Sequence, residues 1–207
     1  MKTNIHFFDQ GEAVTKPQVS ERIGIRGRLA MELAALKLPI LPGFVIDAEV
    51  AAKLGDEKVK DALAPWLARL AKRTGKTFGD PANPMLVKIV VSPNLVIAAY
   101  PTLHNYGLTD ATLPGFVKYV GDNFGRHEMQ YLCRGNLEIE SRIAELEGRE
   151  KDAKKVKEAI AKLDKQLSGK MSPAEREESV HAVAGLLPKG FFSGDAYEQM
   201  EIALKRI

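Results

Sequence analysis

The sequence has little of several features that mark specialised protein classes. It contains one cysteine, Cys133, in 207 residues, which excludes an internal disulfide framework and a cysteine-based zinc site. No apolar run approaches the ~20 residues that a membrane-spanning helix needs. The first nine residues lack the apolar core of a secretory signal. We therefore expect a cytoplasmic protein with no membrane contact.

Charge of one sign is also scarce, because 30 basic residues face 27 acidic ones and the net charge is only +3. Acidic residues alternate with the recurring arginines, and aromatic residues are not interleaved with them, so nucleic acid is not an expected partner. The histidines are dispersed without metal-ligand spacing, so no metal site is expected. These histidines are His6, His104, His127 and His181.

The first half of the chain alternates short strand and helix patterns, which indicates an α/β (α+β) subdomain. Leu29, Leu33 and Leu36 follow one another at intervals of three or four, with Ala30 and Met31 beside them, which predicts that they form the buried stripe of a helix over 25–36. Pro65 is expected to kink or split a helix over 56–73. The other elements expected here are a strand over 5–8, a strand over 41–46 and a helix over 48–54 with Asp47 as its N-cap.

The segment 85–91 carries the strongest strand pattern in the sequence. Its residues are β-branched and nearly all apolar, which is typical of a central strand buried on both faces. Lys88 interrupts this run. Its ammonium group contacts a phosphate, or else its stem packs while the charge reaches water. Further strands are expected over 95–99 and 103–108.

After Asp110 the composition becomes helical and charged. A helical pattern covers 138–167 with Gly148 inside it, where glycine costs about 1 kcal/mol relative to alanine and marks a bend or a hairpin corner. Ser172, Pro173 and Glu175 form a capping-box start for another helix, and a last helix is expected over 196–207. We therefore expect two parts: an α/β subdomain over 1–111 and a helical subdomain over 112–207.

The most informative motif is the Gly-x-x-Gly turn from Gly24 to Gly27, which opens the helix over 25–36. Free backbone amides and the positive end of a helix dipole suit an anion at such a turn. Arg26 lies inside the turn, and its guanidinium can bind an oxyanion with two hydrogen bonds. The alternative is a solvated arginine at a helix start. Gly24, Arg26 and Gly27, with Lys88, are therefore the predicted phosphate-binding residues.

Four segments resemble the N-terminal part of pyruvate phosphate dikinases, in the same order along the chain. The first segment runs from Gly24-Ile25-Arg26-Gly27 to Leu38-Pro39-Ile40-Leu41-Pro42-Gly43-Phe44. The other three are the segments 72–87, 105–110 and 195–200. The resemblance implies the first part of an ATP-grasp nucleotide-binding domain with its inserted helical subdomain. In that family, a loop lysine and a strand arginine hold the ATP phosphates. Here Arg26 stands at the lysine position and Val90 near the arginine position.

These departures lead to two functional hypotheses. The first is a non-catalytic remnant that acts as an interaction module or a weak phosphate- or nucleotide-binding module. The alternative is one subunit of a split ATP-dependent dikinase, in which another chain completes the site. No cofactor is assigned to the chain alone, and ATP with Mg²⁺ is expected only where a partner completes the site. The expected partner is another protein, or a second copy bound through the helical subdomain.

Overall fold

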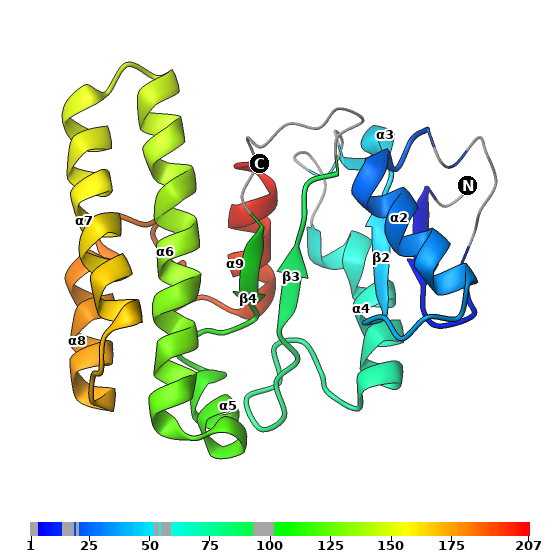
Figure 1. Ribbon diagram of the computed structural model, residues 1–207, viewed down its shortest axis with the longest axis horizontal. Coiled ribbons are helices and arrows are strands. Elements are labelled where there is room, and N and C mark those ends of the chain that lie inside the picture. Colours follow the sequence, from blue (N-terminus) through cyan, green and yellow to red (C-terminus); the bar gives the residue numbers. More distant parts are fainter. Residues whose placement is uncertain (1–3, 14–18, 20, 52–53, 55–58, 93–101) are drawn as a thin grey trace. The chain divides into compact units, whose positions relative to one another are not determined.

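The computed structural model describes residues 4–13, 19, 21–51, 54, 59–92 and 102–207. The described chain is mostly helical, with two small two-stranded antiparallel sheets, which confirms a mixed α/β fold (Figure 1). The backbone forms two compact units. Unit 1 comprises Met1–Gly75 and Val90–Tyr100, and unit 2 comprises Lys76–Ile89 and Pro101–Ile207. This division differs from the predicted boundary at 111, because the second sheet clusters with the helices that follow it.

Unit 1 is built on a two-stranded antiparallel sheet. Strand β1 (Ile5–Phe8) pairs with β2 (Gly43–Ile46), and Ile5 lies opposite Ile46. Both strands lie within the segments in which the sequence pattern predicts them. The helices of unit 1 are α2 (Gly24–Ala35), α3 (Ala48–Ala51) and α4 (Val59–Thr74). Asp47 accepts a hydrogen bond from the Glu49 amide at 2.9 Å, which confirms its role at the start of α3.

Helix α4 packs on this sheet and continues through Pro65. Its buried residues Val59, Leu63, Leu67 and Leu70 recur at intervals of three and four, which is the pattern of one helix face. Pro65 lies on the exposed face, so the carbonyl group that loses its hydrogen-bond donor can face water. Of the two predicted effects, Pro65 therefore does not split the helix, and a kink at Pro65 stays a prediction.

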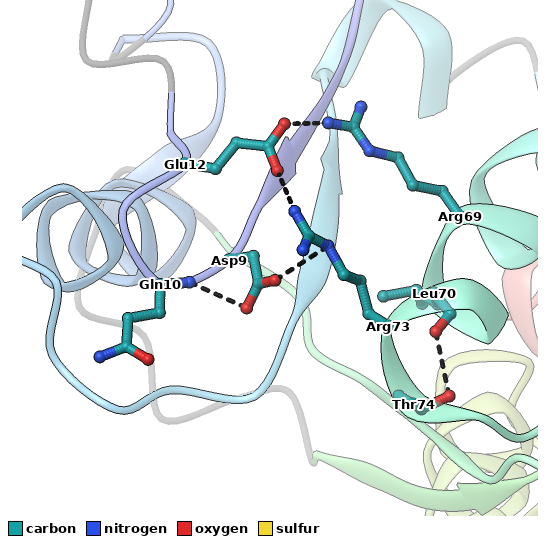
Figure 2. Close-up of polar contacts among 7 residues, drawn as sticks. All are labelled: Asp9, Gln10, Glu12, Arg69, Leu70, Arg73 and Thr74. Carbon is teal, nitrogen blue, oxygen red and sulfur yellow. Dashed lines mark hydrogen bonds and ion pairs between the residues drawn. The ribbon is translucent and has the colours of Figure 1, made fainter.

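An ion-pair network joins the end of β1 to α4 (Figure 2). Arg73 binds Asp9 through Nε at 3.1 Å and Glu12 through Nη2 at 2.9 Å, and Glu12 also pairs with Arg69. The Arg69 guanidinium lies 3.9 Å from the centroid of the Phe7 ring. These groups are partly exposed, so each ion pair contributes about 0–1 kcal/mol and the network mainly fixes the orientation of α4.

The buried face of α2 is not the leucine stripe that the sequence predicts. Leu29, Leu33 and Leu36 are 49%, 41% and 71% exposed, whereas Met31 is 1% exposed. The buried positions are Gly24, Gly27, Met31 and Ala34, which also follow helical spacing. Small residues on this face let the helix approach the sheet closely: a Cβ atom at position 27 would lie 2.9 Å from a methyl group of Val45.

The segment 85–91 does not form the buried central strand that its sequence predicts. Strand β3 (Val87–Ile89) is short and pairs with β4 (Leu103–Tyr106) across an irregular register. Lys88 is exposed and its two neighbours are half-buried, so β3 is not buried on both faces. Pairing of β3 with β4 alone in a two-stranded antiparallel sheet, rather than a central place in a larger sheet, explains this exposure. The strand predicted over 95–99 lies outside the described residues.

Unit 2 contains a long helical hairpin (Figure 1). Helix α6 (Asp122–Leu146) packs on β4 and on α7 (Glu150–Ser168), and Gly148, with φ of 70°, forms the corner. The hairpin interpretation of Gly148 is confirmed. Helix α6 begins at Asp122, well before the predicted start at 138. The sequence pattern does not show this start, because buried polar residues interrupt the apolar pattern in the first half of the helix. One of them, Asn136, accepts a hydrogen bond from the Tyr106 hydroxyl.

The remaining helices of unit 2 are α5 (Leu113–Val120), α8 (Pro173–Ala184) and α9 (Ala196–Leu204). Ser172 and Glu175 form the predicted capping box at the start of α8. Buried Gln199 ties α9 to the loops of the unit, since its amide oxygen accepts from the Gly107 amide at 2.9 Å. Within the described ranges, no helix combines the length and apolar composition needed to cross a bilayer.

Candidate phosphate-binding site

The turn at Gly24 is shaped by a close approach of backbone to backbone. Gly24 has φ of 68°, which disfavours any side chain. A Cβ atom at this position would lie 1.6 Å from the carbonyl oxygen of Ser92. The close approach of the Ser92 backbone, which lies in the same unit, is therefore enough to require glycine at position 24.

Ser92 caps helix α2 from a distant part of the sequence. Its hydroxyl accepts a hydrogen bond from the Gly27 amide at 2.8 Å and donates one to the Ile23 carbonyl at 2.8 Å. The N-cap residue Ile23 has no side-chain group that could cap the helix. The first four amides of a helix, from the N-cap to the third helical residue, lack intrahelical acceptors and are the groups that bind anions. Gly27 is the fourth residue after the N-cap Ile23, so the Ser92 hydroxyl closes the first turn of α2 by bridging the Gly27 amide and the Ile23 carbonyl.

Arg26 is exposed at the start of α2. Its Nη1 atom donates to the Val91 carbonyl at 3.3 Å, and no carboxylate of the described residues lies within ion-pair distance. A guanidinium has five N–H donors, so Arg26 keeps donors for an oxyanion. The predicted phosphate contact at Arg26 fits this geometry, and it stays a prediction.

Lys88 lies in unit 2, whereas Gly24, Arg26 and Gly27 lie in unit 1. Burial lowers the pKa of the neighbouring His104 below its ordinary value of 6.5. The positive charge of Lys88 lowers this pKa further, and the carboxylate of Glu128 opposes the shift. His104 is therefore disposed to be neutral near pH 7.

Polar and aromatic side chains lie near His104 in unit 2, and no sequence pattern indicates this cluster. The Tyr131 ring meets His104 edge-on at a centroid distance of 5.3 Å. Glu128 accepts from the Asn105 side chain at 2.8 Å and lies 2.9 Å from Nδ1 of His127. The spacing of residues along α6 could have indicated this grouping, but only after the start of α6 was known.

The one cysteine of the sequence has a structural role. Cys133 is fully buried, and burial raises the pKa of its thiol to about 12, so it is an inert core residue. In the described part of the chain, no group of three or more histidine, cysteine, aspartate or glutamate residues is arranged to hold a metal ion.

Comparison with known proteins shows which proteins the chain is similar to. A pyruvate, phosphate dikinase from Treponema pallidum (strain Nichols) is 42% identical over 204 residues, which is 99% of this chain and 22% of that protein. The chain is homologous to pyruvate, phosphate dikinase. The dikinases of Clostridium symbiosum (26% identical) and Zea mays (chloroplastic dikinase 1, 25% identical) match 57% and 59% of this chain and 14% of their own lengths. No protein-family model matches the chain.

The homology covers nearly all of this chain but a small part of the dikinase. The chain spans about a fifth of the length of its Treponema pallidum relative. The resemblance stated from short segments is thus confirmed over 204 residues. The activity of the whole dikinase belongs to a protein several times longer.

Proposed function

We propose that this chain is a non-catalytic interaction module derived from the ATP-binding part of a dikinase. The observation that carries the proposal is the Ser92 hydroxyl, which closes the turn that resembles the phosphate loop by bridging the Gly27 amide and the Ile23 carbonyl, each at 2.8 Å. Arg26 adds a phosphate contact that is too weak to hold ATP without a partner.

Phosphoryl transfer depends mainly on positioning and on cations that stabilise charge. In the segment that resembles the phosphate loop, Arg26 stands at the position of the family's lysine, and Val90 lies near the position of its strand arginine. These departures support loss of phosphotransfer by the chain alone.

Thermal unfolding of the chain with MgATP tests this proposal. A ligand present at 100 times its dissociation constant adds about 2.7 kcal/mol to the free energy of unfolding. We expect no increase in melting temperature for the chain alone. A dose-dependent increase that Arg26→Ala abolishes would contradict the proposal.

A second candidate function, the subunit of a split dikinase, is favoured by the apolar surface of α2. Leu29, Leu33 and Leu36 are exposed on the helix, and Leu41, which follows it, is 82% exposed. Exposed apolar patches mark interaction sites. The four-residue strands of unit 1 form a sheet of a size that is marginal by itself. In this hypothesis, a polypeptide equivalent to the rest of the dikinase covers these leucines, and ATP with Mg²⁺ binds at the joint site.

Co-purification with the remaining part of the Treponema pallidum relative tests the second candidate. We expect Leu33→Lys together with Leu36→Lys to abolish complex formation. The matched control is Leu146→Lys, because Leu146 is also an exposed leucine but lies at the tip of the hairpin in unit 2. ATP-dependent phosphotransfer by the complex would favour the split enzyme, and an inactive complex would favour the non-catalytic module.

A further inference from the structure

Helix α7 separates its apolar and charged residues onto opposite faces. Ala153, Val156 and Leu163 are buried, and α7 packs against α6. The opposite face carries five exposed lysines that we call the lysine stripe. The lysine stripe consists of Lys151, Lys154, Lys155, Lys162 and Lys165. These residues fall within about 100° of the helix circumference and span roughly 21 Å along its axis, at 3.6 residues per turn and 1.5 Å per residue.

Two of the acidic residues that alternate with these lysines in the sequence are engaged elsewhere. Asp152 pairs with Arg149 at 2.8 Å, and Asp164 pairs with Arg134 of α6 at 3.0 Å. Glu158 is the acidic residue that lies within the stripe. Among the described residues, no carboxylate lies within ion-pair distance of any of the five stripe lysines. The alternation in the sequence therefore hides a one-sided positive surface.

Repulsion between the stripe lysines opposes formation of α7. Like charges three or four residues apart destabilise a helix, and the buried face of α7 holds the helix in place despite them. A positive face that the fold does not require is complementary to an acidic partner.

We propose that the lysine stripe docks an acidic helix of a partner protein. Its carboxylates, spaced by three or four residues, would face the lysines, and one basic residue would face Glu158. This inference goes beyond the proposed function, because it rests on α7 in unit 2 and not on the turn at Gly24. It places partner recognition on α7 of unit 2 rather than on the turn at Gly24 in unit 1.

The composition of the stripe favours a protein over other polyanions. A nucleic-acid backbone would meet the negative charge of Glu158 between lysines, and the stripe offers neither arginine nor an aromatic ring for bases. A membrane-binding helix needs large apolar residues beside its basic ones, and the exposed face of α7 carries none. A mixed pattern of five positive charges and one negative charge can define the register of a protein partner.

Fluorescence anisotropy with a labelled synthetic peptide tests the proposal on the full chain. The peptide is helical, with glutamates on one face at the matching spacing and one lysine placed opposite Glu158. We expect the combined variant Lys151→Glu, Lys155→Glu and Lys162→Glu to weaken binding about tenfold at low salt, since each exposed ion pair contributes modestly. Circular dichroism checks that the variant retains its helices.

The matched control is Lys72→Glu, Lys118→Glu and Lys189→Glu, which changes the net charge equally at exposed lysines outside α7. We expect the control to weaken binding less than the stripe variant does. Equal weakening by both variants would overturn the proposal, because net charge alone would then explain the binding. Absence of peptide binding to the unmodified chain at low salt would also overturn it.

The variant Glu158→Lys distinguishes a protein from a nucleic acid. We expect it to weaken binding of the peptide with the opposing lysine and to strengthen binding of a peptide with glutamate at that place. Tighter binding of duplex DNA than of either peptide, strengthened by Glu158→Lys, would overturn the proposal in favour of nucleic acid.

Discussion

Helices α2 and α7 present opposite kinds of surface to solvent. Helix α2 buries Gly27 and Ala34 and exposes leucines, whereas α7 buries Val156 and Leu163 and exposes lysines. The difference arises from what each helix packs against. The glycines of α2 permit contact with the backbone near Ser92 and the side chain of Val45, and α7 uses ordinary apolar packing on its neighbouring helix.

The two surfaces imply different partners. An exposed leucine face suits burial in a lasting interface, whereas an exposed lysine face suits a salt-sensitive one. The contrast between α2 and α7 requires that the small-residue face of α2, and not its leucine face, stabilises unit 1. The following predictions test this requirement, in order of decreasing effect.

The largest effect is expected for Gly24→Ala. The new Cβ atom would overlap the Ser92 carbonyl and would occupy a backbone conformation with φ of 68°, so we expect a loss of about 3 kcal/mol or more. Urea denaturation of the chain measures the change. Gly75→Ala is the control: its φ is 70° but nothing lies within 4 Å of the added methyl group. An equal loss in the two variants would show that the contact with Ser92 is unimportant.

The next effect compares two neighbouring positions on α2. Met31→Ala removes a side chain that is 1% exposed, and we expect a loss of about 2–5 kcal/mol. Leu33→Ala removes an exposed side chain, and we expect a change within about 0.5 kcal/mol. Chemical denaturation with two probes measures both. The reverse ranking would place the leucines inside and would remove the contrast with α7.

A smaller effect is expected for Ser92→Ala. Loss of the hydroxyl leaves the Gly27 amide and the Ile23 carbonyl without this partner, and capping groups contribute about 1 kcal/mol. Ser193→Ala, an exposed serine in unit 2, serves as the control and should be neutral. If the two variants were equally stable, Ser92 would not cap the helix.

The smallest effect concerns pH. The pKa of His104 is lowered by burial and by Lys88, so the folded state resists protonation. The unfolded chain then binds more protons as pH falls through 6.5, and this contribution to stability is lost below that pH. Histidine NMR titration should place the His104 pKa below 6.5, and Lys88→Gln should raise it. A pKa at or above 6.5 would contradict the cluster geometry.

Much of the fold follows from local patterns in the sequence. The helix starts at Ser172 and Asp195 and the hairpin corner at Gly148 depend on neighbours within a few residues, so sequence patterns reveal them. The buried face of α2 depends on the distant residues Val45 and Ser92, which no local pattern contains. The sequence pattern does not show the early start of α6, because the buried residues Gln130 and Asn136 are polar and interrupt the regular spacing of apolar residues. Both are hydrogen-bonded within the core.

The candidate site was predictable to a similar extent. The turn from Gly24 to Gly27 and its exposed Arg26 lie where the motif indicates. The role of Ser92 was not predictable, because a hydroxyl 65 positions away in the sequence reaches Gly27 only in the folded chain. The lysine stripe was hidden for a related reason: which acids pair with which bases depends on the contacts of α7 with α6.

The most direct measurement follows the backbone amide of Gly27 by NMR while MgATP is added to the chain alone. If Ser92 holds this amide, its resonance should not shift in a saturable manner at millimolar MgATP. It should respond to Ser92→Ala without any ligand. A saturable shift in the unmodified chain, lost in Arg26→Ala, would show that the turn binds the nucleotide unaided and would contradict the non-catalytic interaction module.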